Sequence, residues 1–311
     1  MFRGDKTKAA AYPADRGAYL KYFAALLLFG SNGIIASSIH LASCRIVLYR
    51  IVLGSLLLLV TAGKTQALRG AAKHRKDLLF VCLSGMCMGI SWLFQYEAYE
   101  RIGISITSLV YCLGPVLVII LAQFVFREKI TARKILCLAA VISGLLLING
   151  VSLKQGAGMT GIICALMCAA AYAGMIIFNK KSLLITGLAN SALQLTAGAV
   201  TVLIFNIIRQ ISSPGMLSFP AQRAEWLPIL VLGLVNTGAG CYLYFSGISS
   251  IPAQTVAVCD YIEPLTALIL AAVILRESLS PPQIAGAALI LGGTLVWNSR
   301  LTINPSTNII S

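Results

Sequence analysis

An apolar segment over residues 253–275 carries two acids and a proline near its centre, and this combination constrains the chain more than any other feature. The remaining residues are mainly valine, alanine, leucine, isoleucine and threonine. Because about 20 apolar residues span a bilayer as a helix, we predict a transmembrane helix here. Pro264 lies near its middle and is expected to bend it. Asp260 and Glu263 are three positions apart and share a helix face.

The composition also indicates a membrane protein. Charged residues make up 11% of the chain and hydrophobic residues 58%, whereas a soluble domain carries about 25% charged residues. The net charge of +14 would suit a nucleic-acid-binding protein, but the basic residues lie in short connections between apolar segments. That placement is typical of positive-inside topology. We therefore expect membrane lipids, and no nucleic acid, around this protein.

The apolar segments of spanning length number ten. They cover residues 18–38, 42–62, 78–98, 104–126 and 132–150, and then 159–179, 188–209, 226–247, 253–275 and 281–298. The predicted fold class is an all-α membrane protein with ten transmembrane helices. The LASC sequence at 41–44 resembles a lipoprotein cleavage box, so a cleaved signal peptide is the alternative to a retained first helix.

The chain repeats itself at a constant offset. Pro115 and Pro264 are 149 positions apart, and so are the Arg-Glu pairs at 127–128 and 276–277. A fixed offset over so many residues indicates an internal duplication. Each copy holds five helices, an odd number, so the copies enter the membrane from opposite sides. Inverted repeats of this kind are typical of secondary transporters, which place the substrate site between the copies.

The duplication defines the predicted organisation. We expect a cytosolic tail at 1–17, a first five-helix repeat at 18–150, an inverted second repeat at 151–300 and a C-terminal tail at 301–311. Most of the 24 lysines and arginines lie on segments that face the cytosol if the N-terminus does. We therefore predict a multi-pass protein of a bacterial inner membrane with both termini cytosolic.

These motifs resemble the drug/metabolite transporter superfamily, specifically its EamA-type ten-helix carriers. The resemblance covers about residues 20–298 and rests on IVLYR at 46–50, YCLGP at 111–115 with REKIT at 127–131, and YIEP at 261–264 with RESLS at 276–280. It implies a carrier that moves small metabolites by alternating access, often outward. Members handle amino acids, amines, purines, sugars and lipophilic drugs. Asp260 departs from the family pattern, in which a small or polar residue is usual.

The two acids are the strongest functional candidates. An unpaired charge near the bilayer centre costs at least about 2.5–3.5 kcal/mol, so both acids should face a cavity, a partner or a proton. The first copy has Tyr111 and Gly114 at the positions that match Asp260 and Glu263. We infer a one-sided role for the acids, such as cation binding or proton coupling. The structural alternative for Glu263 is a bond to backbone groups released by the proline.

Further polar and aromatic residues are candidates for substrate contact. Arg50 lies about 12 Å into its span, and it can pair with an acid or bind a substrate carboxylate. For each aromatic or amide residue alone, packing or an interfacial position is the alternative. The candidate substrate or proton site comprises Asp260, Glu263, Tyr261, Tyr111, Trp92, Tyr96, Asn32, Arg50, Asn236 and Tyr242, with Tyr172 as a further lining residue and Pro115 and Pro264 as helix-bending residues.

Other features have structural interpretations. Glu97 and Arg101 are four positions apart and should pair near the outer helix end. The GxxxG sequence at 85–89 predicts close helix packing. Glu128 is expected to hold the loop before the next helix, and His40 to lie in an outer loop.

The predicted function is secondary transport, not catalysis. The sequence has no nucleotide-binding loop, no His-rich metal cluster and no Ser/His/Asp set placed for catalysis, so we expect no cofactor and no metal. The expected substrates are small metabolites such as amino acids, amines or drugs, exported by proton antiport or by facilitated diffusion. A nucleotide-sugar or nucleoside carrier and a channel-like membrane protein are the alternatives. The sequence is compatible with both a monomer and a homodimer.

Overall fold

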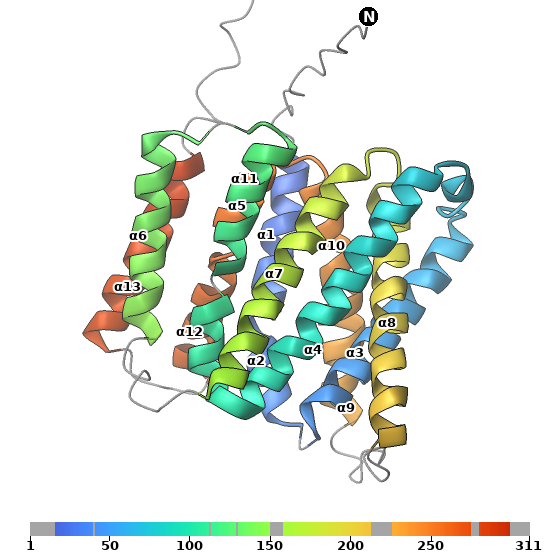
Figure 1. Cartoon of the computed structure of the whole chain (residues 1–311), viewed down its shortest axis with the longest axis horizontal. Helices are drawn as coiled ribbons and strands as arrows, with labels where there is room; N and C mark the ends of the chain where they lie inside the picture. Colours follow the sequence, from blue (N-terminus) through green and yellow to red (C-terminus); the bar gives the residue numbers. More distant parts are fainter. Residues whose placement is uncertain are drawn as a thin grey trace, which may run out of the picture.

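The computed structural model describes residues 16–39, 41–111, 113–128, 130–149, 158–212, 226–274 and 280–298. Within these ranges the regular structure is entirely helical (Figure 1). Most of the predicted tail at 1–17, the whole tail at 301–311, His40 and the Arg-Glu pair at 276–277 lie outside the described residues.

The elements of the two copies follow one another along the chain. The first copy contains α1 (Arg16–Gly30), α2 (Asn32–Ser37), α3 (Ser43–Lys64), the short 3₁₀ helix η1 (Ala71–Lys73), α4 (Arg75–Tyr111), α5 (Leu113–Val125) and α6 (Ala132–Asn149). The second contains α7 (Met159–Lys181), α8 (Gly187–Ser212), α9 (Trp226–Leu230), the π-helical η4 (Val231–Ala239), α10 (Gly240–Ile248), α11 (Ala253–Cys259), α12 (Ile262–Ile274) and α13 (Pro281–Asn298).

Several helices have the length and apolar composition of a membrane span. Among the described residues there are 7, namely Arg16–Ala36, Cys44–Lys64, Arg75–Ile102, Met159–Lys181, Gly187–Ile211, Trp226–Ile248 and Ala253–Ile274. Two shorter apolar helices, Leu113–Val125 and Pro281–Trp297, accompany them. The chain is therefore an all-helical protein with several candidate membrane spans.

The sequence offset recurs in the structure. The ends of α12, at 262 and 274, lie 149 positions after the ends of α5, at 113 and 125. The ends of α13 follow those of α6 at the same distance. Pro115 and Pro264 are each the third residue of their helix, where a missing N–H costs least. The duplicated sequence thus produces duplicated helix ends.

The matching helices α6 and α13 pack against each other in opposite directions. They lie side by side at the left of the bundle in Figure 1. At the start of α6, the Arg133 guanidinium donates to the carbonyl of Val296, near the end of α13. The ammonium of Lys134 lies 5.2 Å from the ring centroid of Trp297. Equivalent helices of the two copies are therefore antiparallel here.

Glycines allow this pair to approach closely. A Cβ on Gly144 would lie 2.5 Å from the carbonyl oxygen of Gly286, and a Cβ on Gly293 would lie 3.0 Å from that of Cys137. Gly144 and Gly293 occupy matching positions in the two copies, and so do Cys137 and Gly286. The two close contacts are consequently related by the internal repeat.

The copies also pack through α4, which contacts α7 and α8. A Cβ on Gly85 would lie 2.2 Å from the carbonyl oxygen of Gln194, and one on Gly89 would lie 2.8 Å from that of Gly198. Any side chain at these two positions would push α8 away. The close packing predicted from the GxxxG sequence is confirmed.

One predicted helix boundary is wrong. The sequence suggested a break at 99–103, yet α4 continues through these residues to Tyr111. The matching stretch of the second copy contains Pro252, where α10 and α11 are separate, whereas 99–103 contains no proline. The Glu97–Arg101 pair adds a bond across the expected boundary. Gly103 alone does not end the helix.

Candidate functional site

The candidate site is built around the break between α11 and α12. The helix ends at Cys259 and resumes at Ile262. The Asp260 N–H still bonds to the carbonyl of Val256 at 2.9 Å, and the Glu263 N–H bonds to the carbonyl of Asp260 at 3.0 Å. Pro264 follows within the first turn of α12 and has no N–H to donate. The break places the side chain of Asp260 among helices of both copies.

Three tyrosine hydroxyls surround the carboxyl group of Asp260. The Tyr22 hydroxyl on α1 is 2.5 Å from Oδ1. Oδ2 contacts the hydroxyls of Tyr172 on α7 and Tyr244 on α10, the latter at 3.0 Å. Tyr22 is fully buried, and Tyr172 and Tyr244 are each 5% exposed. Phenol groups both donate and accept hydrogen bonds, so this cluster can hold the acid in either charge state.

Tyr22 can adjust to the charge of Asp260. Its hydroxyl is also 2.8 Å from the carbonyl oxygen of Val256. When Asp260 is ionised, Tyr22 donates to Oδ1, because an ionised carboxylate only accepts. When Asp260 carries a proton on Oδ1, that proton is donated to Tyr22, which then donates to Val256. Neither state leaves a buried polar group unpaired.

Arg50 on α3 occupies a second polar region. Its Nε donates to the hydroxyl of Thr237 at 3.0 Å, and its guanidinium carbon lies 4.4 Å from the ring centroid of Trp92. The side chain is buried, with 6% exposure. Stacking over an indole ring stabilises a guanidinium that has left water. Arg50 also attracts Glu263, and Glu263 repels Asp260, so charge links the two regions.

The π-helical η4 supplies the partner of Arg50. Thr237 donates to the carbonyl of Leu232, five residues earlier, at 2.8 Å. The neighbouring Asn236 amide is 2.9 Å from the carbonyl of Leu28 and 2.9 Å from Oδ1 of Asn32. The amide therefore joins η4 to the interruption between α1 and α2. Single π turns inside α-helices are frequent at functional sites.

The remaining predicted residues lie in different surroundings. Tyr111 stacks edge-on against Tyr172 with ring centroids 5.4 Å apart, next to the Asp260 cluster. Tyr261 packs in a separate apolar cluster with Val141, Leu145, Leu265 and Ile290, facing α6 and α13. Tyr96 stacks against Tyr99, and Tyr242 packs against the main core. The structure thus brings Tyr111 beside Asp260, and it gives Tyr261 packing partners on another side.

Three residues of the site were missing from the predicted set. Tyr22 and Tyr244 contact Asp260, and Thr237 contacts Arg50. Tyrosines in spanning helices are ordinarily assigned to interfacial belts. The available signal was an intramembrane acid without a cation nearby in sequence, since such an acid needs hydroxyl or cationic partners from other helices.

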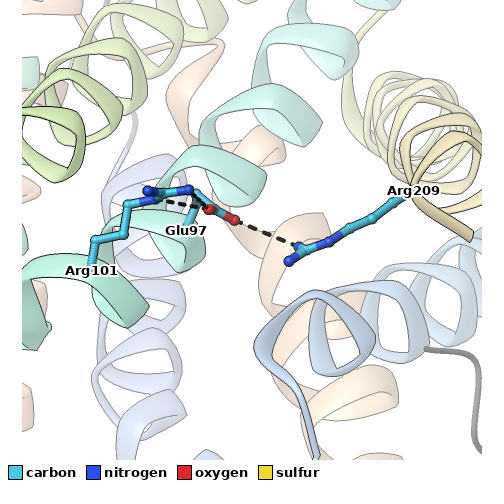
Figure 2. A network of polar contacts seen from close by, with 3 residues as sticks. All are labelled: Glu97, Arg101 and Arg209. Carbon is cyan, nitrogen blue, oxygen red and sulfur yellow. Dashed lines mark hydrogen bonds and ion pairs between the residues drawn. The ribbon is translucent and has the colours of Figure 1, made fainter. Parts of the chain in front are cut away.

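A second charged group lies away from Asp260, between α4 and α8 (Figure 2). Arg101 donates to Oε1 of Glu97 through Nε at 2.9 Å and Nη2 at 2.6 Å, which confirms the predicted pair. Arg209 on α8 is 3.6 Å from Oε2 of the same carboxylate. The exposed fractions of the three side chains are 47% for Arg101, 25% for Glu97 and 29% for Arg209. Exposed ion pairs of this kind contribute little to stability.

No group of three or more His, Cys, Asp or Glu side chains that could hold a metal ion occurs among the described residues. The site consists of one acid among tyrosines, one arginine over an indole ring and a second acid, Glu263, in the first turn of α12. Such an arrangement can bind a small charged molecule or a proton.

The EamA-like transporter family model matches residues 16–150 and again 159–299. The chain belongs to the EamA-like transporter family. Each match covers one copy of the internal repeat, so the EamA-like chain has a two-repeat architecture.

Several relatives of this EamA-like chain are named as transporters. It is 23% identical over 280 residues to the uncharacterized transporter YxxF of Bacillus subtilis, covering 89% of this chain and 88% of the relative. It is 25% identical over 292 residues to the riboflavin transporter ImpX of Fusobacterium nucleatum, covering 89% and 95%. It is 27% identical over 183 residues to a "probable amino-acid metabolite efflux pump" of Salmonella typhimurium, covering 57% and 61%.

A solved crystal structure shares the fold of this EamA-like chain. The TM-score is 0.77 at 18% sequence identity, and the match covers 94% of this chain and 100% of the other.

Proposed function

We propose that this EamA-like chain is a secondary transporter that exports small metabolites, such as amino acids or amines, across a bacterial inner membrane by alternating access. Family membership and the names of the relatives support transport in general. The proposed mechanism rests on one observation. The carboxyl group of Asp260 is held by hydroxyls from α1, α7 and α10, which belong to both copies of the repeat.

The proposed topology has ten crossings in two inverted repeats, with both termini cytosolic. The shorter helices α5 and α13, together with α6, complete the set of crossings. The antiparallel packing of α6 against α13 supports the inversion. The exposed basic residues Lys64, at the end of α3, and Arg69 and Lys73, between α3 and α4, support a cytosolic position for that connection.

Proton coupling is proposed at Asp260. When the carboxyl group takes up a proton, Tyr22 redirects its hydroxyl from Asp260 to Val256, and the acid becomes a donor. Tyr22 belongs to the first copy and Asp260 to the second, so this change alters a contact between the copies. The charge state of Asp260 can therefore bias the relative position of the copies, as alternating access with an exchanged proton requires.

The proposed substrate class follows from the charges of the site. Arg50 provides a buried cation beside Trp92, and Glu263 provides an acid close to it. A molecule with a carboxylate and an ammonium group complements both side chains. Amino acids and their derivatives have this pattern. The names of two relatives, a riboflavin transporter and a probable amino-acid metabolite efflux pump, add riboflavin and amino-acid metabolites to the compounds to be examined.

Reconstituted transport tests the proposal. Purified protein is first screened for thermal stabilisation by amino acids, amines, nucleosides and riboflavin. Uptake of each labelled stabilising compound into proteoliposomes is then measured with and without unlabelled compound inside. A carrier gives saturable uptake that internal substrate accelerates. Non-saturating flux, or ion currents of high conductance in a planar bilayer, would favour the channel alternative. Uptake confined to nucleosides or nucleotide sugars would favour the other carrier class.

A further inference from the structure

The turn between α10 and α11 contains two sets of backbone groups that have side-chain partners from other helices and connections. α10 ends at Ile248 and α11 begins at Ala253. Carbonyls at the end of a helix and N–H groups at the start of the next lack partners within their own helices. Ile251 and Ala253 are fully buried, so water cannot reach them to form hydrogen bonds with the backbone of the turn. The N–H of Ile251 bonds to the carbonyl of Ile248 at 3.2 Å within the turn, and the other buried groups need side chains from elsewhere.

Lys180, near the end of α7, satisfies the carbonyl side. Its ammonium donates to the carbonyls of Ile248 at 2.9 Å, Ser249 at 3.2 Å and Ile251 at 2.7 Å. An ammonium has three N–H donors, so these acceptors use its full capacity. The side chain is 5% exposed. A positive charge at the C-terminal end of a helix is also favoured by the helix dipole.

Glu128, which follows α5 in the first copy, satisfies the N–H side. Oε1 accepts from the N–H of Ala253 at 3.0 Å, and Oε2 accepts from the N–H of Gln254 at 3.1 Å. Its own carbonyl accepts from the side-chain amide of Gln254 at 3.1 Å. Both carboxylate oxygens are thus occupied by the first two residues of α11. Glu128 and Lys180 also attract each other across the turn.

We infer that Glu128 and Lys180 form a gate clamp, which holds the α10–α11 turn and positions the segment that carries Asp260. This inference rests on the proposed alternating-access function. α11 connects the clamp directly to the site, because Asp260 follows the last residue of α11. The clamp lies at the end of the bundle where α6 begins and α7 ends, which is the upper end in Figure 1.

Neighbouring contacts close the same end. Lys134 on α6 donates to the side chain of Gln254 at 2.6 Å. The indole N–H of Trp297 on α13 is 3.4 Å from the hydroxyl of Thr255. Glu128 and Lys134 come from the first copy, whereas α11 is in the second. Separation of the copies at this end therefore requires that the bonds of Glu128 to α11 break, and these bonds are formed in the structure.

Cysteine labelling tests the clamp without any need for a known substrate. Thr255→Cys is introduced, and its modification by a membrane-impermeant methanethiosulfonate reagent is followed by peptide mass spectrometry. The variants Glu128→Gln and Lys180→Met each remove one charge of the clamp. We expect labelling at position 255 to become roughly tenfold faster in each variant. A loss of about 1.4 kcal/mol of bias toward the closed state raises the ratio of open to closed protein tenfold. Lys181→Met, at the exposed neighbour of Lys180, is the matched control and should leave the rate unchanged.

A charge swap distinguishes a backbone clamp from a simple ion pair. In Glu128→Lys with Lys180→Glu the opposite charges remain, but a lysine cannot accept from N–H groups and a glutamate cannot donate to carbonyls. We expect labelling to stay fast in the swapped protein. Restoration of slow labelling by the swap, or unchanged labelling in Glu128→Gln, would overturn the inference. Rates are compared only for protein that elutes as a single species, and Glu128→Gln decides the question if the lysine variants do not fold.

Labelling and transport, measured on the same variants, distinguish failure of the clamp from failure of the proposed transport function. Fast labelling in protein that transports nothing would support the clamp and count against the transporter proposal. Active transport with unchanged labelling in Glu128→Gln would support the transporter proposal and overturn the clamp.

Discussion

The hydroxyl oxygen of Tyr22 lies 2.5 Å from Oδ1 of Asp260, and this contact joins the first copy of the repeat to the helix break of the second. The same hydroxyl has the carbonyl of Val256 as another acceptor at 2.8 Å. Since the phenol has one proton, it donates to only one of these acceptors at a time, and a proton on Oδ1 of Asp260 would turn it toward Val256. A shift of the proton on Asp260 is therefore also a change in how α1 is bound to the second copy.

Removal of the Tyr22 hydroxyl should impair proton-coupled transport. We expect Tyr22→Phe to reduce transport driven by a pH gradient by roughly tenfold, because a hydrogen bond to a charged group contributes about 1.5–3 kcal/mol. Tyr19→Phe, on the same helix, is the matched control, since Tyr19 stacks against Phe23. The readout is the initial rate of substrate uptake into proteoliposomes under a fixed gradient. Equal rates in both variants would exclude Tyr22 from coupling.

Replacement of Arg50 by lysine should weaken substrate binding. The charge is kept, but the planar stacking over Trp92 and the Nε bond to Thr237 are lost. We expect the apparent affinity to fall by roughly 2- to 30-fold, the range that corresponds to a cation–π contact of about 0.5–2 kcal/mol. Concentration dependence of uptake measures this. Arg209→Lys is the control, and an identical affinity in Arg50→Lys and wild type would contradict substrate contact at Arg50.

A glycine substitution should test the packing between α6 and α13. A Cβ at Gly144 would lie 2.5 Å from the Gly286 carbonyl oxygen, whereas nothing lies within 4 Å of a Cβ at Gly292. Gly144→Ala should therefore destabilise the protein by about 1–3 kcal/mol through overpacking. Gly292→Ala should be neutral or stabilising by up to about 1 kcal/mol. Thermal unfolding in detergent compares them, and equal melting temperatures would show that the close approach of the two helices is not required.

The ion pairs of Glu97 with Arg101 and Arg209 should contribute little to transport. The three side chains are partly exposed, and such pairs contribute about 0–1 kcal/mol. We expect Glu97→Gln to keep the uptake rate within roughly twofold of wild type, since these pairs do not contact Asp260 or Arg50. Uptake and melting temperature are measured together. A large loss of uptake with unchanged melting temperature would place Glu97 in the transport cycle.

Much of the architecture could be predicted from the sequence. Apolar runs without charges require helices in a membrane, and the offset between Pro115 and Pro264 predicted matching helices, which the ends of α5 and α12 reproduce. Helix boundaries were less predictable. Whether 99–103 remains helical depends on competition between Gly103 and the Glu97–Arg101 pair, and the pattern of apolar residues does not decide it.

The partners of Asp260 could not be predicted. The direction of a tyrosine side chain depends on the rotation of its helix and on which helices pack beside it. A single sequence gives neither the rotation nor the neighbours. The sequence alone therefore did not single out Tyr22 and Tyr244. The π-helical η4 adds a further difficulty, because its wider turn moves Asn236 and Thr237 off the faces that a 3.6-residue period assigns.

The most direct test of the proposed mechanism compares wild-type protein with Asp260→Asn in proteoliposomes, with a labelled compound identified in the stabilisation screen. Exchange across the membrane without a pH gradient is measured beside accumulation driven by a gradient. We predict that Asp260→Asn loses accumulation by at least roughly tenfold while exchange stays within about threefold of wild type, because the substituted side chain cannot take up or release the coupled proton. Accumulation by Asp260→Asn equal to that of wild type under the same gradient would contradict proton coupling at Asp260.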